Sequence, residues 1–241
     1  MSPAERFGCI REIDPGQPSS WTGRVFLTLD IDWAPDEVLS DSIDLIERAD
    51  IEATWFITHD TPLLGRLRSN PRFELGVHPN FNFLLSGDMR NGATSDEVLG
   101  RLLDVVPEAT AVRSHSMTQS SMLLNLFAAR GLTHDCNHFV PAEAGIDLKP
   151  WRSWNNLVKV PYCWEDDIAY LPGETPSIIE VVAGAGLVVV DFHPIHVFLN
   201  TPNLAHYERA RPFYQDSATL RGLRHKQRGT RHVLSELLER R

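Results

Sequence analysis

The sequence predicts an α/β fold with about seven parallel strands, closed into a barrel or left open as a doubly wound sheet. Short apolar runs alternate with segments of helical spacing, which is typical of right-handed βαβ units. The length of 241 residues suits one such domain and allows a large core without disulfide bonds. Folds of this class place their functional side chains at the carboxyl ends of the strands.

Seven segments have the composition of buried strands, because they are rich in apolar and β-branched residues and too short for helices. They are 24–30, 53–57, 73–77, 111–113, 132–135, 157–163 and 187–192. Six further segments show the apolar spacing of amphipathic helices. They are 38–49, 63–67, 95–106, 121–130, 177–183 and 231–240. Asp36 and Glu37 suit the first turn of the first helix, and Ser95 suits the cap of the third.

The chain is predicted to hold a single catalytic domain over residues 24–241. Residues 1–23 are an irregular lead-in, because Pro3, Pro15 and Pro18 interrupt them and no apolar period is present. No internal repeat and no long linker divides the rest of the chain.

Charge and composition exclude several kinds of partner. The formal net charge of -9 at pH 7 argues against nucleic acid. No apolar stretch approaches the length of a transmembrane segment, and the N-terminus lacks the apolar region of an export signal, so we expect a cytoplasmic protein. Three cysteines without a CxxC pair predict reduced thiols and no cysteine zinc site.

Side chains able to bind a metal or move a proton follow five of the predicted strands. They are Asp30 and Asp32, His78, Arg113 and His115, residues 165–167, and His193 and His196. Each alone is more often a turn or cap residue. Charged groups gathered at one end of a sheet, however, need partners or an ion. Carboxylates with imidazoles favour one divalent transition metal, Zn²⁺ first, with Co²⁺, Mn²⁺, Ni²⁺ or iron as alternatives.

Five motifs carry a family resemblance: TLDID at 28–32, GVHPN at 76–80, VRSHS at 112–116, VPYCWEDD at 160–167 and DFHPIH at 191–196. In order and spacing they resemble the motifs of the polysaccharide deacetylase superfamily, the NodB-homology or carbohydrate esterase family 4-like proteins. The resemblance spans residues 24–200 and is strongest to a divergent branch of O-antigen biosynthesis. It implies an irregular (β/α) barrel of about seven parallel strands. It also implies metal-dependent N- or O-deacylation, usually of amino sugars.

The resemblance implies roles for the catalytic groups. Asp30 matches the base of the first motif, and Arg113 matches the third-motif arginine that orients this base. The fourth-motif acid that holds Arg113 lies within 165–167, and we select Asp166 as a catalytic-site residue. His193 matches the fifth-motif histidine, which is the general acid.

The implied metal ligands depart from the family pattern. The family's ligand aspartate follows the base directly, whereas here Asp32 lies one position further on. His78 matches the first ligand histidine, but the second position is Asn82, a poor zinc ligand. His115 is our first candidate for the missing ligand, and His196 is the alternative.

Four residues beside these motifs are candidates for substrate binding: Trp33, Asn80, Asn82 and Trp164. For both tryptophans, packing in the core is the alternative to stacking on a sugar.

The main functional hypothesis is a hydrolase that removes an acetyl or other small acyl group from a carbohydrate, such as a glycan or O-antigen precursor. One alternative is a metal-dependent amidohydrolase that cleaves a carbon–nitrogen bond of another acylated small molecule. A second is a degenerate relative that binds a glycan or a partner protein, which Asn82 favours. A third is a scaffold whose polar residues merely cap the strands.

Overall fold

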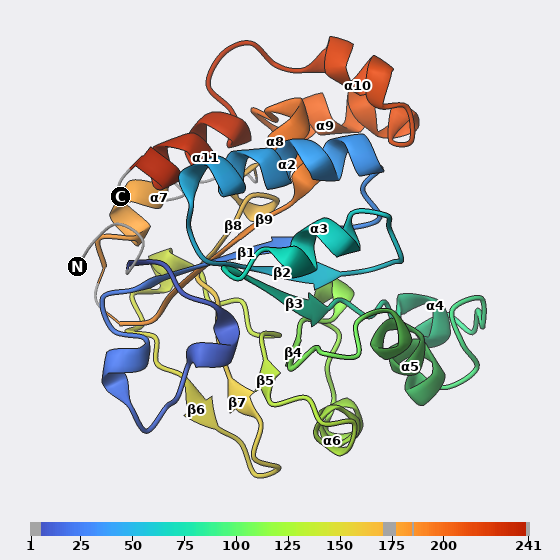
Figure 1. Ribbon diagram of the computed structural model, residues 1–241, viewed down its shortest axis with the longest axis vertical. Helices are drawn as coiled ribbons and strands as arrows, with labels where there is room; N and C mark the ends of the chain where they lie inside the picture. Colours follow the sequence, from blue (N-terminus) through green and yellow to red (C-terminus); the bar gives the residue numbers. More distant parts are fainter. Residues whose placement is uncertain (1–5, 171–176, 185, 240–241) are drawn as a thin grey trace.

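The computed structural model describes residues 6–170, 177–184 and 186–239. The strands within these residues form one nine-stranded sheet. The strand order is β6-β7-β5-β4-β3-β2-β1-β9-β8, and every neighbouring pair is parallel except β6 with β7. Because β6 and β8 lie at opposite ends of this order, the curled sheet is an open half-barrel (Figure 1). The predicted α/β class is therefore confirmed.

Four strands of five or six residues make the centre of the sheet. They are β1 (Val25–Asp30), β2 (Ala53–Ile57), β3 (Phe73–Val77) and β9 (Val188–Phe192). All of their residues are buried, so both faces of the sheet are covered. Five strands of two residues extend it: β4 (Ala111–Val112), β5 (His134–Asp135), β6 (Trp151–Arg152), β7 (Val158–Lys159) and β8 (Trp164–Glu165). The predicted count was too low because two residues give no periodic signal.

The six predicted helices are present with slightly shifted ends. They are α2 (Asp36–Ala49), α3 (Leu64–Ser69), α5 (Ser95–Val105), α6 (Ser121–Ala129), α7 (Ile178–Val181) and α11 (Thr230–Glu239). The last position of the predicted final helix, Arg240, lies outside the described residues. The cap of α5 is Thr94 and not Ser95, because the Thr94 side chain accepts the Glu97 N–H at 3.2 Å. Four short helices were not predicted: α4 (Asn82–Leu85), α8 (Pro194–Leu199), α9 (Leu204–Ala210) and α10 (Ser217–Leu223).

The described part of the lead-in, residues 6–23, is packed into the main core. It contains two short 3-10 turns, Ile10–Glu12 and Pro18–Ser20. Phe7, Ile10 and Ile13 are buried in the same apolar cluster as the central strands. Apolar burial of this kind stabilises the fold by about 25 cal/mol per Å² of surface removed from water, so residues 7–13 contribute to stability.

A second, smaller apolar cluster joins α2, α8, α9 and α10, and we call it the C-terminal cluster. Its buried members are Ala34, Val38, Ile195, Phe198, Leu199, Ala210 and Leu220, with Tyr207 and Tyr214 packed at its edge. In Figure 1 these helices lie together on one side of the sheet.

Two expectations from composition can be compared with the structure. All three cysteines are free and buried. Within the described ranges, no helix has both the length and the apolar character that a membrane span requires.

Candidate metal centre and active site

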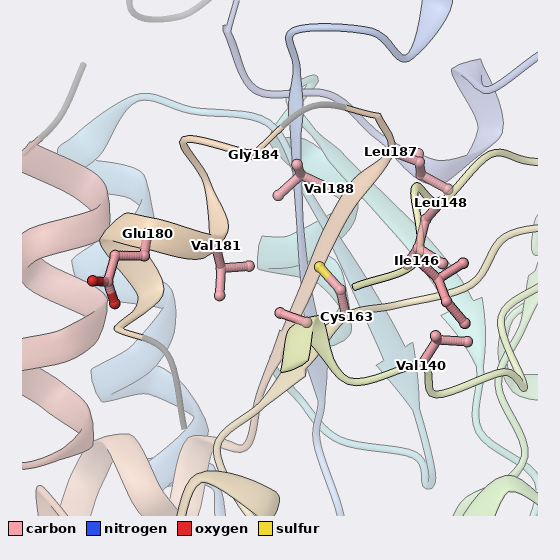
Figure 2. A pocket seen from close by; sticks show the side chains of 10 residues that line it. Val140, Ile146, Leu148, Cys163, Glu180, Val181, Gly184, Leu187 and Val188 are labelled. Carbon is pink, nitrogen blue, oxygen red and sulfur yellow. The ribbon is translucent and has the colours of Figure 1, made fainter. Parts of the chain in front are cut away.

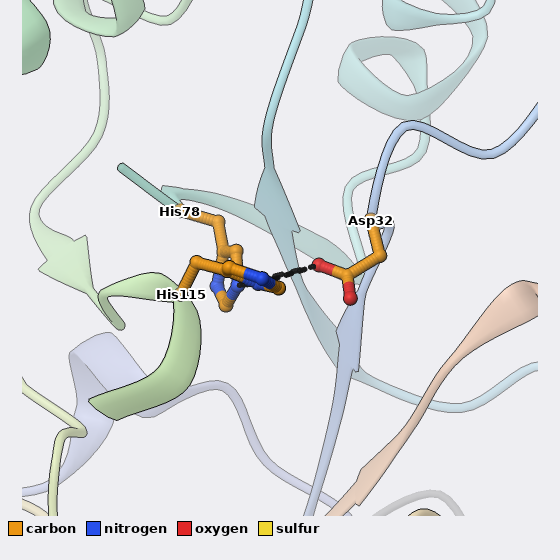
Figure 3. A group of neighbouring side chains, drawn as sticks. All are labelled: Asp32, His78 and His115. Atoms are coloured by element: carbon orange, nitrogen blue, oxygen red, sulfur yellow. Dashed lines mark hydrogen bonds and ion pairs between the residues drawn. The ribbon is translucent and has the colours of Figure 1, made fainter. Parts of the chain in front are cut away.

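Asp32 lies on an unusual turn that follows β1. Its φ is 40° and that of Trp33 is 55°, so two consecutive non-glycine residues adopt the left-handed region. Two hydrogen bonds hold this turn: the Trp33 N–H donates to the Thr58 hydroxyl at 3.0 Å, and the Tyr214 hydroxyl donates to the Asp32 carbonyl oxygen at 2.6 Å. The side chain of Asp32 thereby reaches the carboxyl end of the sheet beside His78 and His115 (Figure 3).

Asp32, His78 and His115 present three ligand atoms at nearly equal separations. Asp32 Oδ1 lies 3.4 Å from His78 Nε2 and 3.4 Å from His115 Nδ1, and the two nitrogens lie 3.3 Å apart. Ligands about 2.0–2.1 Å from a tetrahedral zinc ion are separated by about 3.3–3.4 Å. The triangle therefore fits three corners of a tetrahedral site, and the fourth is left for water or substrate.

The protonation states of this trio also suit a cation. Among the described residues, the nearest nitrogens to the buried Oδ1 of Asp32 are those of His78 and His115, both 3.4 Å away and outside ordinary hydrogen-bond geometry. Burial alone would raise the pKa of Asp32, but the neighbouring imidazoles, His115 foremost, outweigh it and hold this pKa at about 2. Burial lowers the pKa of His78 to about 3, so its ring is neutral. His78 Nδ1 lies 3.2 Å from Asp30 Oδ2, and Nε2 on the other side of the ring lies 3.3 Å from His115 Nδ1, so Nε2 is the nitrogen that faces the candidate centre.

The segment that carries His115 is braced by two asparagines. The Asn137 side chain accepts the Ser114 N–H at 2.7 Å. Asn82 donates to the Ser116 hydroxyl at 3.0 Å and accepts from the Thr118 hydroxyl at 3.1 Å. Asn82 thus supports the segment that delivers His115, which explains how an asparagine can occupy the position where the family pattern has a ligand histidine.

Arg113 is held by different acids from those we predicted. It is buried, and its Nη1 donates to Asp30 Oδ1 at 2.9 Å and to Asp191 Oδ1. Our expectation that an acid within 165–167 holds Arg113 is wrong. Asp191 lies next to Thr28 across β1 and β9, and the Thr28 hydroxyl also donates to Asp191 Oδ1, at 2.6 Å. This register places the acid beside Arg113.

Burial shifts the pKa values of the two aspartates, Asp30 and Asp191, and of Arg113 in opposite directions. Burial raises the pKa of Asp30 well above its ordinary value, although Arg113 acts in the opposite direction. Burial also raises the pKa of Asp191. Burial would lower the pKa of Arg113, but Asp191 and Asp30 outweigh it and raise this pKa. Asp30 therefore holds a proton more tightly than an exposed aspartate, which suits a proton acceptor.

Asp166 orients His193. The His193 ring Nδ1 lies 2.7 Å from Asp166 Oδ1, and the His193 backbone N–H donates to Asp166 Oδ2 at 2.9 Å. Burial would lower the pKa of His193, but the carboxylates of Asp167 and Asp166 outweigh it and raise this pKa well above the ordinary value. The Nε2 atom lies 3.7 Å from Asp32 Oδ2, so this nitrogen faces the candidate metal centre.

His196 lies in a different group from the three candidate ligands. Its Nε2 contacts the Asp167 carboxylate, and its Nδ1 lies 3.1 Å from the Thr201 hydroxyl. These contacts favour His115 over His196 as the third ligand.

Two of the candidate substrate-binding residues, Trp33 and Asn80, lie beside the candidate centre, whereas Trp164 lies in the core. The Trp33 ring meets the His115 ring edge to face at 5.1 Å, at the candidate centre. Asn80 lines a small neighbouring cavity together with Trp33. Trp164 is buried and packs on Phe192 at 4.8 Å, which is the core-packing alternative.

The cavity at the candidate centre is small and polar. It has a volume of about 100 Å³, and Asp30, Asp32, His78, His115 and His193 are among its lining residues. A larger cavity of about 300 Å³ lies near the amino ends of β8 and β9, where mostly apolar side chains such as Val140, Leu148 and Val188 surround Cys163 (Figure 2). Because the polar groups gather at the carboxyl ends, we assign chemistry to the smaller cavity.

Comparisons with known proteins agree with this geometry. A family model described as "WbmS-like: Polysaccharide deacetylase" matches residues 27–211. A candidate polysaccharide deacetylase involved in O-antigen biosynthesis, from Bordetella bronchiseptica, is 48% identical, with a TM-score of 0.90 over 98% of each chain.

A more distant structure supports the fold alone. It is a candidate polysaccharide deacetylase from Mycobacterium smegmatis, 15% identical, with a TM-score of 0.52 over 89% of this chain and 84% of the other. A comparison with curated proteins finds no match. The matched family model and the full-length likeness show that this chain belongs to the WbmS-like polysaccharide deacetylases.

Proposed function

We propose that this chain is a single-domain, metal-dependent hydrolase that removes an acyl group from a carbohydrate, with N-deacetylation as the expected reaction. We further propose that it acts in the cytoplasm on a glycan or O-antigen precursor. Family membership and the O-antigen role of the Bordetella relative support the substrate class.

The single observation that carries the proposal is the triangle of Asp32, His78 and His115, flanked by Asp30 and His193. The three ligand atoms have the spacing of a tetrahedral site. A proton acceptor and a proton donor lie on either side of it. A binding module has no need of this combination.

The residues present divide the reaction between them. Asp32, His78 and His115 would hold a divalent transition metal, and when bound such an ion acts as a Lewis acid that activates water and polarises the acyl carbonyl. Asp30 accepts the proton of the attacking water, while Arg113 keeps its carboxylate in place. As the carbon–nitrogen bond breaks, His193 donates its Nε2 proton to the departing amine.

The size of the cavity supports a small acyl group. Its volume of about 100 Å³ is well below that of typical ligand pockets, which are about 300–1,000 Å³. An acetyl or formyl group matches this space better than a long acyl chain, and the rest of the substrate would then lie outside.

The test is acyl release from a panel of N-acetylated and O-acetylated sugars, with simple amides and imides beside them. The protein is first loaded with Zn²⁺, Co²⁺ or Mn²⁺, and bound metal is measured in the same samples. We expect release from an acetylated sugar and a loss of about 10²–10⁴-fold in Asp30→Asn and His193→Gln. Release from amides or imides alone would favour the amidohydrolase alternative. A metal-loaded protein that hydrolyses none of the probes would contradict the proposal and favour a binding role.

A further inference from the structure

The turn that carries Asp32 needs external support. Left-handed φ values are uncommon for residues other than glycine, and a bulky side chain such as Trp33 makes them less favourable still. Such conformations persist where the surrounding structure holds them. Here the Thr58 hydroxyl, just after β2, accepts a hydrogen bond from the Trp33 N–H, and the Tyr214 hydroxyl donates one to the Asp32 carbonyl oxygen.

Tyr214 reaches this turn from a remote part of the chain. It lies 182 positions after Asp32, beyond the residues matched by the family model, and outside all five sequence motifs. Its ring packs at the edge of the C-terminal cluster, between α9 and α10. Its phenolic hydroxyl therefore connects this cluster to the backbone of a candidate metal ligand.

We propose that Tyr214 is a positioning residue for the metal centre, which couples metal binding to the packing of the C-terminal helices. The inference rests on the proposed role of Asp32 as a ligand. Without the phenol, the Asp32 carbonyl loses its donor and the turn can relax toward ordinary φ values. Relaxation would move the Asp32 carboxylate away from its 3.4 Å separations from His78 and His115.

The coupling is expected to act in both directions. The C-terminal cluster is separate from the main core, and its polar ties to α2, such as Arg224 with Asp41 at 3.4 Å, are partly exposed. Small clusters of this kind open locally more easily than a central sheet. If packing of these helices favours metal binding, metal binding must favour their packing by the same factor.

The first experiment compares Tyr214→Phe with Tyr207→Phe. Both variants remove one phenolic hydroxyl from the same cluster and keep the ring. No hydrogen bond of the Tyr207 hydroxyl is present among the described residues, and the Tyr207 ring packs on His196. The Kd for Zn²⁺ is measured by competition with a chelating indicator. We expect a Kd about tenfold higher in Tyr214→Phe and within about twofold of wild type in Tyr207→Phe.

The outcomes separate this inference from the proposed function. Equal Zn²⁺ affinity in wild type and Tyr214→Phe would overturn the positioning role and leave the metal centre intact. No Zn²⁺ binding by the wild type would overturn both. If Tyr214→Phe does not fold, amide hydrogen exchange of the wild type decides: Zn²⁺ should slow exchange in residues 204–223 by about tenfold. Unchanged exchange there would overturn the coupling.

Discussion

Replacing Arg113 by methionine should destabilise the protein strongly, because two buried acids would lose their counterion. Arg113 lies between the rings of Phe56 and Tyr162, at 4.6 and 4.4 Å, and joins Asp30 to Asp191. All three charged side chains are at most 5% exposed. Methionine keeps much of the side-chain length but leaves two carboxylates without a positive partner.

The expected loss follows from the burial of the group. Removing one partner of a buried ion pair costs about 3–5 kcal/mol. For a chain of this length, each kcal/mol lowers Tm by about 2–4 °C, so Tm should fall by about 6–20 °C. The assay is urea denaturation with thermal melts on metal-free protein.

The pH dependence has a defined sign. Both acids have folded-state pKa values above their ordinary values, and losing Arg113 raises these pKa values further. The folded variant then binds more protons than the unfolded chain. Its free energy of unfolding therefore falls as pH rises above the pKa that the two aspartates have in the unfolded chain. The stability that Arg113→Met loses relative to wild type should be smaller near pH 5 than near pH 8.

Two controls make this reasoning refutable. Arg130→Met removes an exposed pair with Asp96 and should leave the denaturation midpoint nearly unchanged. Adding Asp191→Asn to Arg113→Met should recover part of the loss, because one uncompensated charge disappears. An Arg113→Met variant within about 1 kcal/mol of wild type would refute the account of a buried, mutually dependent group.

Three further predictions concern the site and its support. Asn82→Ala should weaken Zn²⁺ binding about tenfold in an indicator competition, because Asn82 braces the segment that carries His115; unchanged affinity would contradict the brace. Asp166→Asn should lower the rate on an acetylated sugar about 10²-fold with bound metal unchanged, because His193 loses its acceptor; a wild-type rate would remove Asp166 from the mechanism. Glu74→Gln should gain stability over wild type as pH rises from 4 to 8, because burial raises the pKa of Glu74 in the fold; equal unfolding free energies at both pH values would contradict this.

The long strands, and the polar residues at their carboxyl ends, can be predicted from the sequence because both depend on local pattern. β1, β2, β3 and β9 are continuous apolar runs. The two-residue strands β6 and β8 exist through pairing with neighbours and have no local signature.

The candidate site shows the same division. Position after the strands and the family motifs point to Asp32, His78 and His115, and the structure brings these three residues together. Asp166 was expected among the acids that hold Arg113, but Asp191 has that place and Asp166 holds His193, because such pairing depends on register across the sheet. An aspartate inside the apolar run 188–192 was the available signal for Asp191. Tyr214 had none, since its contact spans 182 positions.

The most direct test of the metal centre is the metal content of untagged wild type, His115→Ala and His196→Ala, measured by mass spectrometry. The account predicts about one equivalent of a transition metal in wild type and in His196→Ala, and its loss in His115→Ala. His196 is the matched control because it is also a buried histidine of the fifth motif and its ring contacts Asp167 and Thr201. Metal retained in His115→Ala, or none in wild type after incubation with Zn²⁺, Co²⁺, Mn²⁺ and Ni²⁺, would contradict the central claim.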